Sequence, residues 1–313
     1  DTAVHGRRNL VINGAMQVFQ RGTSFTSNGF GPDRFAVYPT TNGTTFQRST
    51  DAPDGFAYSL TTSGTPTGSY LILTPVELPA TGDAGLLYNG QKITISYYAK
   101  SSSAGDELYN KLTFRDTSTS ATNEVSVDND SSDKHTLTTS WARYSKTYTI
   151  GANPAGTNKS FVVNPRSVST PSGNISITGV QLEVGDKATP FEHRSYADEL
   201  QRCQRYYQRT ESSDSGYANL CVAVNISGSS GSDQRGVVPF TTAMRANPAL
   251  STNGSLAVLP LGGGVSSIAA GDGLTTHSAG IRVNTSSNIS QGQSTLLRQN
   301  NDATAHLQFD AEL

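Results

Sequence analysis

The sequence predicts an all-β protein: an antiparallel β-sandwich or jelly roll, a short linking helix, and a second, smaller β-sandwich domain. Strand and turn formers dominate the composition, with 30 Gly, 13 Tyr and 11 Phe among 313 residues and Ser, Thr and Asn in nearly every stretch. Many short segments alternate apolar and polar residues, the period of a strand with one buried face. One segment carries the capping and the periodicity of a helix.

Length and composition set the expected number of domains. A chain of this length with 35% hydrophobic and 15% charged residues can bury more than one core, so we expect two domains. We place the first domain at residues 1–194, a linking helix at 195–210 and the second domain at 211–313.

The strand pattern of the first domain is clearest in residues 91–100, where Ile93, Ile95 and Tyr97 share one face. Further strands are expected at residues 35–38, 45–48, 58–61, 71–78, 112–115, 141–150, 160–163 and 174–182. Lys146 interrupts the apolar face of its strand, so we expect that strand near a sheet edge. So many strands without intervening helices favour an antiparallel sandwich or jelly roll over a parallel α/β sheet.

The linking helix is expected to begin after Ser195, which is placed to cap it, with Asp198 as the third helical residue. Acidic residues lead this segment and arginines trail, an order that suits the helix dipole. The sequence therefore predicts a well-defined helix start.

An apolar stripe runs along the same helix. Tyr196, Leu200, Cys203 and Tyr207 are spaced by four, three and four residues, and Tyr206 lies beside them. The stripe fits two structures, packing onto a neighbouring domain or contact around an oligomer axis.

The second domain is predicted from weaker signals. Short strands are expected at residues 218–226, 235–240, 249–252, 280–283 and 305–313, separated by Gly-rich and polar loops. Such loops are suited to exposure at a tip.

Charge and hydropathy argue against nucleic-acid and membrane functions. The formal net charge is -2, and no run of Lys or Arg is long enough to follow a phosphate backbone. No window approaches the roughly 18 apolar residues of a membrane span, and residues 1–25 lack a signal-peptide core. We expect a soluble protein that neither binds nucleic acid nor inserts into a membrane.

Metal and cofactor sites are not expected. The two cysteines, Cys203 and Cys221, have no metal-ligand spacing and are expected to be reduced, structural thiols. The oxygen-rich run 128–133 lacks the later Glu and the Gly of a calcium-binding loop, which favours a solvated turn.

No catalytic constellation is evident, so we expect a protein that is not an enzyme. The five histidines are scattered, and nothing fixes a carboxylate pair at glycosidase separation. The acidic residues that hydrolysis would draw on are Asp106, Glu107, Asp128, Asp130 and Asp133.

Several blocks of the chain resemble tail-fibre and other appendage proteins of tailed bacteriophages. They are residues 9–22 (NLVINGAMQVFQRG), 178–185 (TGVQLEVG) running into 188–192 (ATPFE), 203–207 (CQRYY) and 238–248 (VPFTTAMRANP). Residues 9–194 also resemble carbohydrate-binding jelly-roll modules, with SYYAK at 96–100 and SWARY at 140–144 as two sheet strands. The resemblance extends to about residue 248.

The resemblance implies a structural and adhesive virion protein, assembled in the host cytoplasm and exposed on the particle surface. It implies a homotrimer that contacts other virion proteins and a host-surface glycan or protein. Two alternatives stay open: a capsid fibre, decoration or tail-neck protein without receptor binding, and a polysaccharide-depolymerising tailspike.

Aromatic side chains are the candidates for sugar binding, because their rings combine apolar faces with polar edges. The candidates are Tyr38, Tyr70, Tyr88, Tyr98, Tyr109 and the only tryptophan, Trp141. Each also fits the sandwich core or an interface, and the sequence does not separate these roles.

A buried ion pair is expected near the start of the chain. Arg21, Asp33 and Arg34 fall in the stretch that resembles the phage proteins. We expect their pairing to tie the opening loop to the sandwich.

Overall fold

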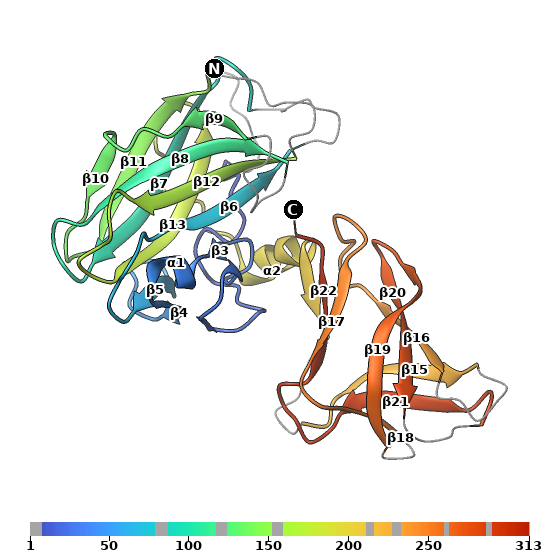
Figure 1. Cartoon of the computed structure of the whole chain (residues 1–313). Helices are drawn as coiled ribbons and strands as arrows, with labels where there is room; N and C mark the ends of the chain where they lie inside the picture. The colour runs from blue at the N-terminus through green and yellow to red at the C-terminus, as the bar shows by residue number, and fades with distance from the viewer. Residues whose placement is uncertain are drawn as a thin grey trace. The chain divides into compact units, whose positions relative to one another are not determined.

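The computed structural model describes residues 8–78, 87–116, 124–151, 159–210, 216–226, 233–259, 263–285 and 290–312. Contacts divide the chain into two compact units, Asp1–Leu200 and Gln201–Glu312. Strands dominate both units (Figure 1), which confirms the predicted all-β class.

Two antiparallel sheets make up the first unit. The six-stranded sheet has the order β1 (Ser24–Phe25), β4 (Thr45–Ser49), β5 (Ser59–Ser63), β13 (Ile175–Val184), β7 (Lys92–Ser101), β11 (Ala142–Thr149). The seven-stranded sheet has the order β10 (Lys134–Thr136), β8 (Glu107–Arg115), β12 (Ser160–Ser167), β6 (Ile72–Glu77), β3 (Ala36–Val37), β2 (Gly29–Phe30), with β9 (Val125–Asp128) also paired to β8. Helix α1 (Pro39–Asn42) follows β3.

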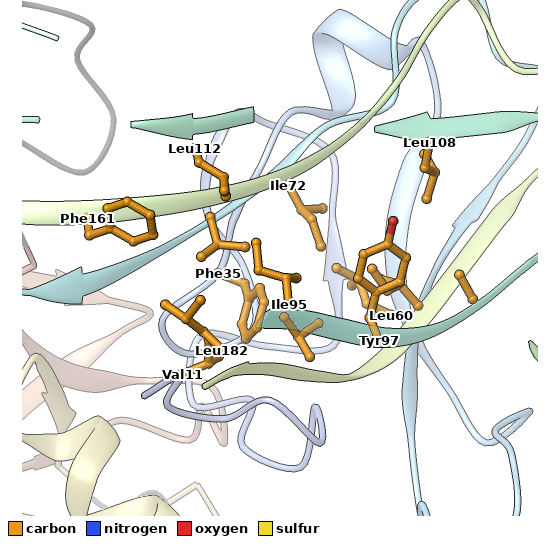
Figure 2. Packing of buried hydrophobic residues seen from close by; sticks show 14 of the residues in the cluster. Val11, Phe35, Leu60, Ile72, Ile95, Tyr97, Leu108, Leu112, Phe161 and Leu182 are labelled. Carbon is orange, nitrogen blue, oxygen red and sulfur yellow. The ribbon is translucent and has the colours of Figure 1, made fainter. Parts of the chain in front are cut away.

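Side chains from both sheets meet in one apolar core (Figure 2). Ile95 and Tyr97 of β7 and Leu182 of β13 lie in the same cluster as Leu112 of β8 and Phe161 of β12. Burying a side chain of this size contributes about 1.5–3 kcal/mol, so the core is the main source of stability. The apolar face predicted for residues 91–100 is confirmed, since its three members are fully buried.

The opposite face of β7 is also covered, which the alternating pattern did not predict. Thr94 and Ser96 are 2% and 0% exposed. Thr94 Oγ1 donates to the Gly185 carbonyl at 2.9 Å, and Arg143 Nη2 reaches Ser96 Oγ at 2.8 Å and also donates to the Thr189 carbonyl. The chain that follows β13 therefore folds back over the outer face of the six-stranded sheet.

The edge position of β11 is confirmed. This strand ends the six-stranded sheet, and Lys146 Nζ lies 2.6 Å from Asp133 Oδ1. A lysine on an edge strand keeps its charge near solvent and disfavours pairing with another chain.

Helix α2 (Tyr196–Gln204) begins as predicted and ends earlier than predicted. Ser195 Oγ accepts the backbone N–H of Asp198 at 3.2 Å, the side-chain cap expected from the sequence. The expected extent of 195–210 is wrong, because β14 (Tyr207–Arg209) pairs with β22 (His306–Asp310) instead. Strand pairing over a long sequence separation here overrides local helix propensity.

The second unit contains a closed barrel in place of the expected sandwich. The barrel order is β15 (Asn219–Asn225), β16 (Gln234–Pro239), β20 (Ser278–Thr285), β19 (Gly263–Leu274), β18 (Leu256–Leu259), β21 (Ser294–Gln299). A three-stranded sheet of β14, β22 and β17 (Ala249–Asn253) accompanies it. Strand β21 pairs with both β18 and β15, and this closure leaves the barrel without an open edge.

Both cysteines are free thiols, as expected. Cys203 is fully buried, and burial raises the pKa of Cys221 to about 11. Among the described residues no helix has the length and apolar character needed to cross a bilayer.

Candidate functional site

The blocks at residues 9–22 and 178–185 lie against each other in the first unit. Leu10 N donates to the Leu182 carbonyl at 2.9 Å, and Val180 N donates to the Gly14 carbonyl at 2.9 Å. The register of β13 against β7 is interrupted between Thr178 and Gln181, within the second block. The opening segment therefore supplies the backbone partner that this irregular part of β13 needs.

Arg194 joins these blocks to the start of helix α2. Its Nη1 donates to the Val11 carbonyl at 3.0 Å and lies 3.4 Å from Glu199 Oε1, and its Nη2 donates to the Asn9 carbonyl. The Glu192 carboxylate lies 3.5 Å from the same Nη2 atom. The Arg194 side chain is only 5% exposed, so it carries a buried charge held between two carboxylates. We call these bonded groups the Arg194 network.

Asn13 fixes the turn within the opening block. Its φ of 60° is left-handed, a conformation that asparagine tolerates better than most residues. Its Nδ2 donates to the carbonyls of Val18 and Asp33 at 2.8 and 2.9 Å, and its backbone N–H donates to Glu199 at 2.6 Å. The residues that carry the phage resemblance in these blocks thus have a structural role here.

The expected ion pair near the chain start is present. Asp33 is 1% exposed, and its Oδ1 lies 3.9 Å from Arg21 Nη1. Arg34 is fully buried, and its Nη2 donates to the Pro75 carbonyl at 2.8 Å, which anchors it to β6. Asp33 also accepts two bonds from Gln20, at 2.7 and 2.6 Å.

The aromatic candidates for sugar binding do not gather at one place. Tyr70 is buried in the core, and Tyr109 is 7% exposed under the Arg166 guanidinium on the seven-stranded sheet. Tyr38 is half-buried against an apolar cluster of that sheet, and Tyr88 stands exposed before β7. None of these four forms a surface with the remaining two.

Tyr98 and Trp141 do share a surface, on the outer face of the six-stranded sheet. Strands β7 and β11 pair Tyr98 with Arg143, which places Trp141 beside Lys100. Lys100 Nζ lies 5.3 Å from the centre of the half-buried Trp141 ring, and the indole N–H donates to Asp51 Oδ1 at 2.9 Å. Lys100 Nζ bonds the other Asp51 oxygen at 2.6 Å.

The pKa of Asp51 is lowered by two hydrogen bonds to its carboxylate, with the larger effect from Lys100 and the smaller from Trp141. The Asp51 carboxylate therefore stays ionised to pH values below the usual aspartate pKa, and only under more acid conditions does it protonate. The indole ring keeps its acceptor, and with it its orientation, across neutral and mildly acid pH.

Three further rings extend this surface beyond Tyr98. Phe56 lies 5.2 Å from Tyr98, 5.0 Å from Phe191 and 5.1 Å from His193, between ring centres. A Cβ at position 179 would come within 2.8 Å of both Phe56 and Tyr98, so Gly179 is needed for their contact. We call Phe56, Tyr98, Trp141, Phe191 and His193 the aromatic face.

The helix residues expected at an oligomer axis do not form one exposed stripe. Tyr196 is 56% exposed and Leu200 is half-buried, but Cys203, Tyr206 and Tyr207 are 0%, 3% and 2% exposed. Tyr207 Oη bonds Gln308 Oε1 at 2.7 Å, and Ala311 N donates to the Tyr206 carbonyl. Of the two structures left open for the stripe, contact around an oligomer axis does not fit Cys203, Tyr206 and Tyr207, because the chain leaves the helix after Gln204 and these side chains are buried within a single chain.

Four of the five acidic candidates form hydrogen bonds or ion pairs within the chain, whereas Oδ2 of Asp128 is buried without a hydrogen-bond partner. Asp106 is 7% exposed and accepts from Ser101 Oγ and from the backbone N–H groups of Ser172 and Gly173 at 2.5–3.0 Å. Glu107 pairs with Lys134 at 2.8 Å, and Asp130 caps its own turn through Ser132. Within the described ranges no group of His, Cys, Asp or Glu has metal-binding geometry.

No protein family and no curated protein matches the sequence. The fold is similar to solved structures at low sequence identity. A tailspike protein 4 enzymatically active domain of bacteriophage CBA120 is 15% identical over 56% of this chain, with a TM-score of 0.38, and the chain spans 21% of that domain's length. A xylan-binding domain from Paenibacillus barcinonensis is 14% identical over 58% of this chain and 99% of that domain (TM-score 0.37). A family 30 carbohydrate-binding module of a Clostridium thermocellum cellulase is 11% identical over 53% and 93% (TM-score 0.33).

Proposed function

We propose that the chain is a glycan-binding appendage protein of a tailed bacteriophage particle. It binds a host-surface sugar on the aromatic face and does not cleave it. The observation that carries the proposal is the aromatic face itself, whose rings are partly exposed where the chain after β13 folds back over the six-stranded sheet. The appendage part of the proposal, with a location on the particle surface, is supported by the sequence blocks that resemble phage fibre proteins.

The chemistry of the aromatic face suits a sugar. Rings such as Trp141 and Tyr98 offer apolar surface to the C–H side of a pyranose, while Asp51, Lys100 and Arg143 offer acceptors and donors to its hydroxyls. The Trp141 ring is held in place by Asp51 before any ligand arrives. A preoriented ring loses little entropy on binding, which favours affinity.

Trp141→Ala is expected to weaken glycan binding by about 2 kcal/mol, roughly 30-fold, because a central aromatic anchor is removed. The sugar is first identified by screening the intact protein on a glycan array, and its affinity is then measured by calorimetry. Tyr88→Ala is the matched control, since Tyr88 is an exposed ring at the other end of β7. Equal weakening by both variants, or no binding to any glycan, would contradict the proposed site.

We also propose that the protein is a homotrimer, as the phage resemblance implies. Its contact surface must then be a different one from the apolar stripe of helix α2. Four apolar residues lie side by side on neighbouring barrel strands: Leu259, Leu296, Val222 and Val237. Leu296 pairs with Leu259 on one side and with Val222 on the other. The register of the next pair of strands, in which Ala223 pairs with Gly236, puts Val237 beside Val222. Val222 and Val237 are 57% and 62% exposed. We call these four residues the apolar row.

The apolar row crosses four neighbouring barrel strands and contains no charge. Ion pairs from Asp233 to Arg235 and to Arg282, both at 3.0 Å, lie on β16 and β20 nearby. An uncharged centre with a charged margin is the usual composition of an interface between copies, so the row fits the same row of a second and a third chain.

Light scattering on the intact protein is expected to give a mass near three times 33.1 kDa. Val237→Asp is expected to reduce it to a monomer, because an unpaired carboxylate would be buried at the contact. Val168→Asp, at a 37% exposed valine of the first unit, should leave the trimer intact. A monomeric wild type, or a Val237→Asp variant that stays trimeric, would refute this part of the proposal.

A further inference from the structure

A cavity of about 310 Å³ lies within the second unit, apart from the aromatic face. The end of helix α2, strand β14 and barrel strands β15 and β16 supply its walls. The volume is at the lower end of the range of ligand sites, about 300–1,000 Å³. A ligand of small size fits it.

Three carboxamides, from Gln204, Gln208 and Asn219, line the cavity. Gln208 is 5% exposed and rigidly held: its amide nitrogen donates to the Thr242 carbonyl at 2.6 Å, and its oxygen accepts the N–H of Thr241 at 3.1 Å. Thr241 Oγ1 also donates to Gln204 Oε1 at 3.1 Å, which orients that amide. Gln204 and Asn219 each carry a donor and an acceptor, so they can bind neighbouring hydroxyl groups, whereas both ends of the Gln208 amide are already bonded to Thr241 and Thr242.

The lining also contains apolar and aromatic side chains. Phe240 and Phe309 stack edge to face with ring centres 5.0 Å apart, and Leu220 and Val238 belong to the same lining. A lining that combines amides with aromatic rings suits a molecule that carries both hydroxyls and C–H groups. Arg209 is the only charged residue among the described lining residues, which favours a neutral ligand over an acidic one.

We propose that this pocket binds a neutral sugar unit, as a second glycan site in the second unit. The inference rests on the proposed function and extends it, since a particle that attaches through two sites on each chain gains avidity from their linkage. Gln204 and Asn219 bind the hydroxyls, and Phe240 packs against the ring.

The test uses saturation-transfer NMR on the full chain with neutral hexoses and N-acetylhexosamines as probes. The wild type is expected to give transfer from at least one of them. Gln204→Ala with Asn219→Ala is expected to reduce the affinity at least tenfold, and both positions are partly exposed, so folding is not threatened. Gln291→Ala, an exposed amide outside the cavity, is the matched control.

The pocket proposal would be overturned if no probe showed saturation transfer. It would also be overturned if the saturation transfer persisted in the Gln204→Ala, Asn219→Ala double variant. Trp141→Ala separates the two sites, because it removes the indole ring from the aromatic face and Trp141 does not line the cavity. If Trp141→Ala alone abolishes the transfer, the sugar binds the aromatic face and the pocket proposal fails. If only the Gln204 and Asn219 substitutions abolish it, the pocket is supported even where the aromatic face binds nothing.

Discussion

Replacing Arg194 by alanine is expected to lower the free energy of unfolding of the first unit by about 3–5 kcal/mol, the cost of removing one partner from a buried ion pair. The substitution leaves the carboxylates of Glu192 and Glu199 and the carbonyls of Asn9 and Val11 without their shared donor. Burial already raises the pKa of Glu199 despite the opposing effects of the Asn13 N–H and Arg194, so loss of the guanidinium would make its charged form still less favourable.

Urea titration followed by tryptophan emission measures this effect, because Trp141 is the only tryptophan and lies in the first unit. Lys187→Ala removes the same charge from an exposed position seven residues away and should change the unfolding free energy by less than about 0.5 kcal/mol. Similar midpoints for the two variants would show that the Arg194 network does not tie the opening segment to the sandwich.

Gly14→Ala is expected to have the second large effect, a loss of about 3 kcal/mol or more from overpacking against backbone. A Cβ on residue 14 would overlap the Val180 carbonyl oxygen and press on Asn9 Nδ2. The opening segment would have to move away from β13, and the hydrogen bond from Val180 N to the Gly14 carbonyl would be lost with it.

The thermal midpoint of the first unit, read from Trp141 emission, checks this prediction. Gly151→Ala is the matched control, because a Cβ there has no atom within 4 Å and the residue has no left-handed φ. The control should be neutral or slightly stabilising, since alanine restricts the unfolded chain. A Gly14→Ala variant as stable as the control would mean that the close approach to Val180 is not required.

Local patterns were sufficient to predict the β class and the start of helix α2. Alternation located the buried face of β7, and Ser195 identified the helix cap, because both depend on residues that are neighbours in sequence. The end of the helix and the closure of the barrel depend on β22 and β21, which lie about 100 and 75 residues away from their partners β14 and β15. Pairings over such distances leave no local signal.

The candidate site was also only partly predictable, because it depends on contacts between residues that are distant in the sequence. Tyr98 and Trp141 could be named as aromatic candidates, but Phe56, Phe191 and His193 join them only because β13 bulges at Gly179 and the chain after it folds back. Phe191 lay in a block that resembles phage proteins, and that was the one available signal. Alternation placed Tyr98 on the face of its strand opposite Tyr97, but no such pattern identified Tyr70 and Tyr109 as buried, because their burial is set by sheet packing.

The most direct test of the central claim is a titration of the intact protein with an array-selected glycan, followed by Trp141 emission. Each chain has a single tryptophan, and it lies on the aromatic face, so its emission reports on that surface alone. We predict a saturable change in emission with a midpoint equal to the Kd from calorimetry. A glycan that binds by calorimetry while the emission of Trp141 stays constant would contradict the account.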